Sequence, residues 1–409
     1  MDTIGSPRLD SKRFWTDNAA LGLATIVAGL FNSAYSVLLA HALGPRSYGW
    51  IGALNNLVSL FLLPLPIIGL GAIRLGKQER QGWLAAATLA MGLVVFGIAT
   101  AFSGQMSRAF AVPQDLIILF AAGTILNFTY ALYVGFLKRA RRYGMVGFLL
   151  VMGSFLAVVA VAGSVTFGRG APIAWLGILQ LSAVALMFVL VLWASRSLPL
   201  IPPTRLEPAV VATTLGVGTL QAIWGITDVL FAKARLSALD AGFYTGLSTI
   251  GQALPFLVSS LATVMLTAIL DAPERRRYYL GRTMAASVGT AAVFMAILLA
   301  FPTEVVRLAL GEAFVPMSQY VQTYTLAMTA LALILVLTTY GVAVGAYLPM
   351  VGAAIGTGAW VYLLAGSHSM AMLVNRTAAA MGGTLGLVVL VFLFNRKKGR
   401  PPEEDRQPI

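Results

Sequence analysis

The sequence has no cysteine, only two histidines and few charged residues. Without cysteine there can be no disulfide, thiolate nucleophile or cysteine-ligated cluster. His41 and His368 lie far apart with no carboxylate cluster beside them, so we expect no metal site and no cofactor. Charged residues make up 11% of the 409 residues, whereas soluble globular proteins carry roughly 25%. This composition excludes a water-soluble protein.

Apolar residues make up 58% of the chain instead. A helix needs about 20 mostly apolar residues to cross a bilayer. We therefore predict an all-α polytopic membrane protein with about 12 transmembrane helices. The loops between the apolar runs are too short for a catalytic domain, and no catalytic motif is present, so we do not expect an enzyme. The predicted spans are 15–42, 49–73, 83–104, 115–137, 144–167, 173–194, 209–232, 242–270, 281–302, 317–340, 347–366 and 371–394.

The formal net charge of +13 is explained by membrane orientation rather than by nucleic-acid binding. If the predicted loops alternate between the two sides, 21 of the 28 Lys and Arg residues fall on one side. Cytoplasmic loops are enriched in Lys and Arg. We therefore predict a multi-pass protein of the bacterial inner membrane with both termini in the cytoplasm. The basic loop 138–142 either contacts anionic lipid or carries ordinary topology charge.

The chain divides near its midpoint into two predicted six-helix lobes. The first lobe covers residues 1–194, a cytoplasmic linker covers 195–208, and the second lobe covers 209–394. The polar residues 395–409 are predicted to form a disordered cytoplasmic tail. Two such lobes around a central cavity are the usual arrangement of a transporter.

Short sequence matches suggest that the two lobes are duplicates. GPRSYGWIGALNNL (44–57) is similar to ALDAGFYTGLSTI (238–250) when Gly49 is aligned with Gly242. AFSGQMSR (101–108) is similar to AFPTEVVR (300–307), and a Val-Pro pair follows each. The offsets of 193 and 199 are close, which favours a parallel repeat. Coincidence between two apolar sequences is the alternative.

Polar side chains gather in the first two spans of each half. Uncharged and acidic polar residues are costly in hydrocarbon and tend to face a bundle interior or a water-filled cavity. Several of them follow one another at steps of three and four, which places them on one helix face. Packing between helices is the alternative explanation, because amides also join membrane helices. The candidate cavity residues are Asn32, Asn55, Asn56, Gln221 and Gln252.

Asp228 is the one acid that we place clearly within a span. It is a candidate for gating or proton coupling together with Arg235, or else it forms an interfacial ion pair with Arg235 or Lys233. Prolines interrupt the second span of each half and predict kinks there, because proline removes a backbone hydrogen bond. They are Pro64, Pro66 and Pro255.

Four segments together resemble the Wzx-like polysaccharide transporters of the multidrug/oligosaccharidyl-lipid/polysaccharide (MOP) exporter superfamily. In chain order they are LLAHALGPRSYGWIGALNNLVSL (38–60), IIGLGAIRLG (67–76), ITDVLFAKARLSALDAGFYTGLSTI (226–250) and VVRLALGEAFVP (305–316). The resemblance implies two lobes around a cationic cavity. It also implies flipping of an undecaprenyl-diphosphate-linked oligosaccharide from the cytoplasmic to the periplasmic leaflet, for O-antigen, capsule or exopolysaccharide export.

Two features depart from that family. The chain has no thirteenth and fourteenth span, and few arginines lie within its spans. Arg74 and Arg282, at the predicted cytoplasmic mouth, are therefore the candidate ligands of the diphosphate, because arginine holds phosphate oxygens in pairs. The expected partners are the lipid-linked oligosaccharide, the bilayer, and a polysaccharide polymerase with its chain-length proteins. The alternatives are an ion-coupled small-molecule exporter of the same superfamily, an unrelated twelve-span transporter, and a membrane polymerase or acyltransferase.

Overall fold

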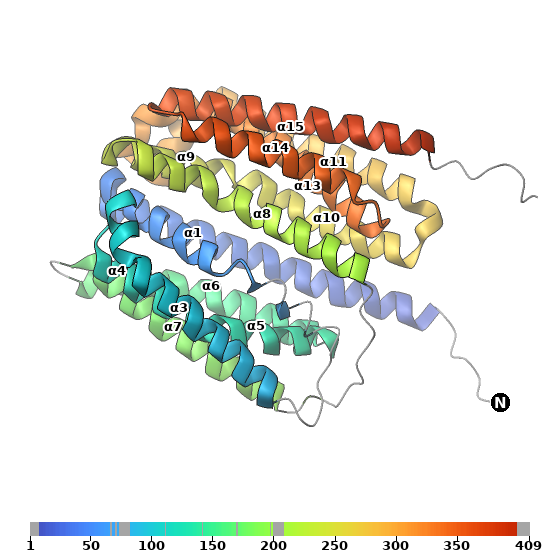
Figure 1. The fold of residues 1–409 in the computed structure, drawn as a ribbon, viewed down its shortest axis with the longest axis horizontal. Coiled ribbons are helices and arrows are strands. Elements are labelled where there is room, and N and C mark those ends of the chain that lie inside the picture. Colours follow the sequence, from blue (N-terminus) through green and yellow to red (C-terminus); the bar gives the residue numbers. More distant parts are fainter. Residues whose placement is uncertain are drawn as a thin grey trace, which may run out of the picture. The chain divides into compact units, whose positions relative to one another are not determined.

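A computed structural model describes residues 8–65, 68–69, 72, 82–110, 112–140, 142–168, 171–196, 198 and 208–398. Within these ranges every element is a helix (Figure 1). The α-helices are α1 (Arg8–Phe61), α3 (Gly82–Phe110), α4 (Gln114–Ala122), α5 (Thr124–Arg139), α6 (Tyr143–Phe167), α7 (Pro172–Ser195), α8 (Pro208–Arg235), α9 (Ala238–Gly251), α10 (Ala253–Asp271), α11 (Arg276–Ala300), α12 (Pro302–Leu310), α13 (Ser318–Ala343), α14 (Leu348–Ala365) and α15 (Met370–Lys398). Two short 3₁₀ helices are η1 (Pro273–Arg275) and η2 (Glu312–Met317).

The predicted all-α polytopic fold is confirmed. Ten helical segments of the described chain are long and apolar enough to cross a membrane. One of them, Leu21–Phe61, is bent at Gly44 and accounts for the first two predicted spans. The predicted span 242–270 corresponds to α9 and α10 together. Every predicted span therefore coincides at least in part with a helix or a broken helix.

Gly44 divides α1 into two arms. Its φ of 68° lies in the left-handed region, where glycine carries no steric penalty. Its ψ of 174° suits a residue that precedes proline, here Pro45. The chain reverses at this point, since the Tyr35 side chain on the first arm contacts Asn55 on the second. The sequence Leu-Gly-Pro thus builds a helical hairpin.

Other helix interruptions differ from the predicted continuous spans. The second arm of α1 ends at Phe61, before the turn that contains Pro64, and of the rest of the predicted span 49–73 residues 62–65, 68–69 and 72 are described. The predicted span 115–137 comprises α4 and α5, which meet at Gly123; its φ of −60° and ψ of −24° stay in the helical region. The predicted span 242–270 is broken at Gln252, where Pro255 cannot donate a backbone hydrogen bond.

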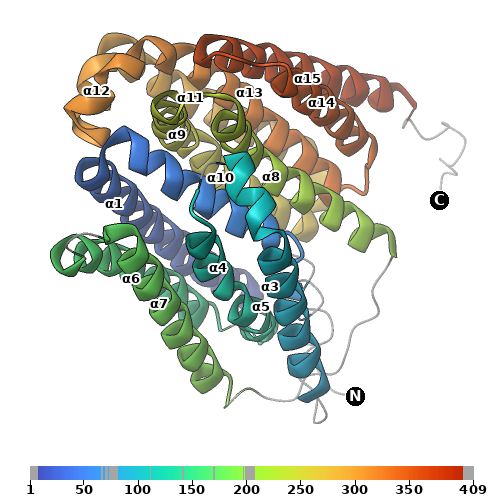
Figure 2. The same cartoon turned by 60° about the vertical axis from the view of Figure 1, so that its left-hand side comes forward.

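The chain forms two compact units. The first contains Met1–Glu207, Gly225–Ile250 and Thr303–Ser318, and the second contains Pro208–Trp224, Gly251–Pro302 and Gln319–Ile409. In the first unit α1 packs on α6, α6 on α7, and α3 on α5 (Figure 2). In the second unit α14 packs on α15 and α10 on α11 (Figure 1). The predicted lobe boundaries at 194 and 209 stay a prediction, and most of the linker and tail lie outside the described residues.

Each unit has its own apolar core. In the first unit, Leu132, Phe136 and Leu137 of α5 meet Leu149 of α6 and Val191 of α7. In the second unit, residues of α10 meet residues of α11 and α13; the buried members include Leu254, Val258, Ala291, Val336 and Tyr340. The first of these cores holds α5 and α7, with Leu21 of α1 packed against it, beside the polar residues described next.

Candidate functional site

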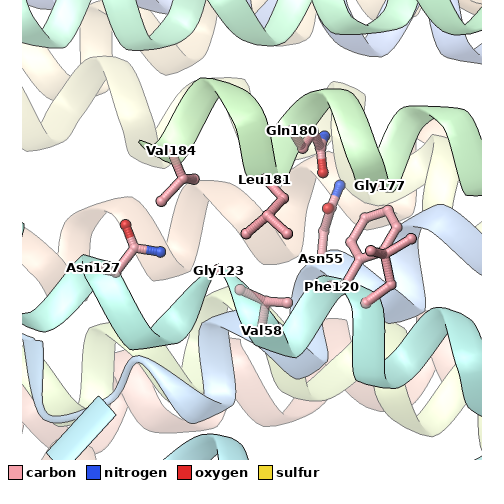
Figure 3. A pocket seen from close by; sticks show the side chains of 10 residues that line it. Asn55, Val58, Phe120, Gly123, Asn127, Gly177, Gln180, Leu181 and Val184 are labelled. Carbon is pink, nitrogen blue, oxygen red and sulfur yellow. The ribbon is translucent and has the colours of Figure 1, made fainter. Parts of the chain in front are cut away.

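A small pocket with three side-chain amides in its wall lies inside the first unit. Its volume is about 80 Å³, and α1, α4, α5 and α7 all contribute to its wall. Figure 3 shows the amides of Asn55 and Gln180 close together, with Asn127 further along the pocket. The lining residues are Asn55, Val58, Leu119, Phe120, Gly123, Asn127, Gly177, Gln180, Leu181 and Val184.

A three-residue hydrogen-bond cluster stands at one end of this pocket. The Tyr35 hydroxyl accepts a hydrogen bond from Nε2 of Gln180 at 2.8 Å and from Nδ2 of Asn55 at 3.3 Å. Tyr35 belongs to the first arm of α1, Asn55 to the second arm and Gln180 to α7. The bend at Gly44 and the core contacts of α7 are therefore both needed to assemble the cluster.

Three amides lie in an otherwise apolar lining, and the described residues of that lining include no Asp, Glu, Lys or Arg. Each amide offers one acceptor and two donors, and the tyrosine hydroxyl can also donate. The volume is large enough for several water molecules, because a single water needs only about 10–15 Å³ of such space. The pocket can therefore bind water or the hydroxyl groups of a ligand.

A second polar cluster lies at the end of α8 within the first unit. The Asp228 side chain is only 1% exposed. One carboxylate oxygen accepts a hydrogen bond from the Val229 amide at 2.8 Å, and the other accepts one from the Tyr244 hydroxyl at 3.3 Å. Hydrogen bonds from α8 and α9 thus stabilise a carboxylate in an apolar surrounding.

Lys233, one turn further along α8, is 5% exposed. Within the described part of the chain its ammonium nitrogen has no hydrogen-bond partner. The nitrogen lies 5.9 Å from the ring centre of Trp50, within the range of a weak cation–π contact. The Arg235 side chain is exposed. An ion pair from Asp228 to Lys233, one of the two roles considered for the acid, is therefore not what the structure shows.

The other predicted cavity residues are distributed over both units. On α1, Asn32 is exposed and Asn56 is half-buried, and neither contributes to the pocket lining. Gln221 on α8 is half-buried, and Gln252 occupies the break before α10; both belong to the second unit. The structure therefore brings only Asn55 of this set into the pocket.

Of the two arginines proposed for the diphosphate, Arg282 does not line the pocket. Arg282, in the second unit, is exposed, and its guanidinium carbon lies 4.9 Å from the ring centre of Tyr278. Arg74 falls outside the described residues.

Sequence reasoning missed three members of the pocket or its cluster. Gln180 and Asn127 are amides within predicted spans, but they lie outside the first two spans of each half and were not selected. Tyr35 on α1 is neither an amide nor an acid, so a search for amides and acids within the spans does not find it. Their amide side chains, which are costly in an apolar span, are the signal that could have found Gln180 and Asn127.

No family model matches the chain, and no curated protein matches its sequence. Solved structures do match its fold. An inward-facing multidrug-resistance MATE-family transporter of the MOP superfamily is 12% identical, with a TM-score of 0.68 over 92% of this chain and 98% of that one. The lipid II flippase MurJ in an inward closed conformation is 14% identical, with a TM-score of 0.64 over 95% of this chain and 87% of that one.

A third similar structure is a MOP-superfamily transporter from Pyrococcus furiosus, for which a reversed polarity of the binding pocket is described. It is 13% identical, with a TM-score of 0.60 over 93% of this chain and 95% of that one. At these identities the likeness concerns the fold. The chain is thus a multi-pass membrane protein with the fold of the MOP-superfamily transporters.

Proposed function

We propose that this chain flips an oligosaccharide linked to undecaprenyl diphosphate from the cytoplasmic to the periplasmic leaflet by alternating access. The membrane would be the bacterial inner membrane, with both termini of the chain in the cytoplasm. The product would supply surface polysaccharide such as O-antigen, capsule or exopolysaccharide. A polysaccharide polymerase and chain-length proteins would then act on the flipped lipid.

The observation that carries the proposal is the uncharged polar pocket in a chain that has the fold of a lipid II flippase over 95% of its length. Sugar hydroxyls both donate and accept hydrogen bonds, and amides match both roles. Tyr35, Asn55 and Gln180 supply these groups without an ionised side chain. At about 80 Å³ the pocket would contact part of one sugar and not contain an oligosaccharide.

The diphosphate needs cationic partners. An unpaired charge that passes through the hydrocarbon core of the membrane costs several kcal/mol. Arg74 and Arg282 remain the candidates at the cytoplasmic mouth. Arg282 is suited to this role because its guanidinium is exposed to a ligand. The guanidinium lies over the ring of Tyr278. In this proposal both arginines meet the headgroup as it enters.

The second candidate function is export of a small molecule coupled to protons or ions. The MATE-family neighbour with its TM-score of 0.68 favours it, as does the buried carboxylate of Asp228, which can bind a proton. The uncharged pocket speaks against cationic drugs as the substrate, because no lining side chain provides the opposite charge.

The experiment that separates the two functions uses purified protein in liposomes. A fluorescent undecaprenyl-diphosphate oligosaccharide is placed in the membrane, and a lectin or glycosidase reports the fraction in the outer leaflet. In liposomes with an active flippase, the fraction of labelled lipid that the lectin or glycosidase cannot reach falls within minutes. In protein-free liposomes this fraction stays constant. An Asn55→Leu/Gln180→Leu double variant should slow the exchange, and Leu93→Ala on the exposed face of α3 serves as control. Uptake of a cationic dye without any lipid exchange would favour the exporter and contradict the flippase.

A further inference from the structure

Four exposed arginines lie within eight residues where η1 meets α11, in the second unit. Within the described residues no ion pair joins any of them to an acid. Two acids precede them in the sequence, Asp271 and Glu274, so the segment 271–282 keeps a net positive charge. We use the name arginine patch for Arg275, Arg276, Arg277 and Arg282 together with Tyr278.

Two tyrosines connect Arg282 to the core of the second unit. Tyr279 packs against that core, and Tyr278 meets Tyr279 edge-on with the ring centres 5.6 Å apart. The guanidinium carbon of Arg282 lies 4.9 Å from the ring centre of Tyr278, within the range of a cation–π contact. Within the described residues its N–H groups donate no hydrogen bond, so they remain for a ligand. A charge that only sets membrane orientation needs no such aromatic support, because orientation follows from the number of Lys and Arg residues.

The length of α11 places the arginine patch at the level of the lipid headgroups. Its 25 residues span roughly 37 Å, whereas the hydrocarbon core of a bilayer is about 30 Å thick. Residues 298–301, at the far end, are apolar, so the excess of roughly 7 Å, or about five residues, falls at the arginine end. Arg282 lies just beyond those residues. It therefore stands close to the boundary between hydrocarbon and headgroups, whichever side of the membrane this end occupies.

The face of α11 that carries Arg282 continues as an exposed apolar stripe. Its members follow at steps of three, four and seven, which keeps them on one helix face. Arg275, directly before α11, precedes Arg282 by seven positions and so starts the same face. Ala291, on the other side of the helix, is buried in the core of the second unit. In the membrane, acyl chains therefore contact the stripe next to the Arg282 guanidinium. The stripe consists of Ala285, Gly289 and Ala296.

We propose that the arginine patch binds an anionic phospholipid, whose phosphate lies on Arg282 and the neighbouring arginines and whose acyl chains lie on the stripe. Guanidinium groups hold phosphate oxygens in pairs. A water-soluble anion makes no use of the apolar stripe, and a zwitterionic lipid brings a cation that the arginines repel. The phospholipid is a bound partner of the chain and not its cargo. Because Arg282 also meets the transported diphosphate in the proposed function, the two lipids compete for it.

The test is native mass spectrometry of the purified full chain with phosphatidylglycerol and phosphatidylcholine of identical acyl chains. The unmodified chain should retain phosphatidylglycerol more tightly. Arg275→Gln/Arg282→Gln should lower that affinity about tenfold, because half of the arginines are lost. Arg282→Lys, which keeps the charge but loses the paired N–H groups, should lower it about threefold. The matched control is Arg46→Gln/Arg108→Gln, which removes two exposed arginines elsewhere and should leave the affinity unchanged. Equal losses in the two double variants, or equal affinity for both lipids, would overturn the proposal.

A second measurement keeps every arginine, so it holds even if the double variant does not fold. A fluorophore on Ala285→Cys in this cysteine-free chain reports quenching by brominated lipids in liposomes. Brominated phosphatidylglycerol should quench it more than brominated phosphatidylcholine, whereas Ala296→Cys, at the other end of the stripe, should show no preference. Equal quenching at Ala285→Cys contradicts the proposal. Pyrophosphate at the bulk concentration of the lipid should leave the preference in place, and its loss would assign the patch to a free anion. A chain that shows the preference but exchanges no oligosaccharide lipid retains the phospholipid site and loses the proposed function.

Discussion

Removing the Tyr35 hydroxyl should destabilise the first unit, because it takes the acceptor from two amides at once. In Tyr35→Phe, Nε2 of Gln180 loses a 2.8 Å hydrogen bond and Nδ2 of Asn55 loses a 3.3 Å one. An unsatisfied buried polar group costs about 1–3 kcal/mol. The pocket of about 80 Å³ beside the amides admits water, which offsets part of this cost. We therefore expect a net loss of about 1 kcal/mol, or about a fivefold change in the unfolding equilibrium.

The matched control is Tyr133→Phe on α5. Within the described residues the Tyr133 hydroxyl has no hydrogen bond, and its ring packs edge-on to Phe136 at 5.9 Å. Thermal unfolding in one detergent, followed by intrinsic fluorescence, compares the two variants with the unmodified chain. Tyr35→Phe should melt at a lower temperature and Tyr133→Phe at an unchanged one. Equal melting temperatures for both variants would refute the role assigned to the Tyr35 hydroxyl.

A double substitution sharpens this prediction. Replacing both partners of a hydrogen bond by apolar groups is often nearly neutral, whereas removing one partner is not. Tyr35→Phe/Gln180→Leu should therefore recover part of the stability lost in Tyr35→Phe, and the double-mutant cycle gives the coupling energy directly. The double variant should also slow oligosaccharide exchange, since it removes the Tyr35 hydroxyl and the Gln180 amide and leaves only Asn55 of the cluster.

Three further predictions use other parts of the chain. Gly242→Ala should cost about 1–3 kcal/mol, because the new methyl group overlaps the Pro45 carbonyl, while Gly97→Ala, in open space on α3, should be neutral or stabilising in the same melting assay. Thr357→Val should cost about 1–3 kcal/mol and shift tryptophan emission, because the buried indole N–H of Trp224 loses its 2.7 Å acceptor. Topology reporters should be periplasmic after residues 46, 108, 169, 238, 312 and 368, and cytoplasmic signals at two or more of these positions would contradict the span assignment.

The helices could be predicted because their signal is local. A span needs only enough consecutive apolar residues, and Leu-Gly-Pro at 43–45 breaks a helix whatever surrounds it. The segment Pro302–Met317 could not be predicted as helix in the same way. It forms α12 and η2, but it is too short to cross a membrane and carries Glu304, Arg307 and Glu312, so it reads as a loop. Arg307 and Glu312 in fact pair at 2.6 Å, and this carboxylate raises the pKa of the Arg307 guanidinium.

The pocket was only partly predictable because its members are joined by tertiary contacts. Asn55 follows from its place on a polar stripe. Gln180 is 145 positions from Tyr35 in the sequence, and nothing local indicates that α7 brings it to the first arm of α1. Asn55 lies in one of the amide-rich spans, whereas Gln180 and Asn127 lie in spans with a single amide each. The packing of α4, α5 and α7 nevertheless brings all three into one pocket. Residue type was informative here, and span membership was not.

The close contact of Gly49 on α1 with Gly242 on α9 shows what an internal repeat can predict that a single span cannot. The alignment of 44–57 with 238–250 was made on similarity alone, yet it pairs residues that touch. The reason is geometric: beside a two-fold axis each side chain meets its own counterpart, so any added volume enters the contact twice. Small residues at equivalent positions of both halves are therefore selected where the axis passes closest to the backbone. Gly49 and Gly242 meet this condition, and Gly52 lies directly against Thr245, its counterpart in the repeat, one turn further along.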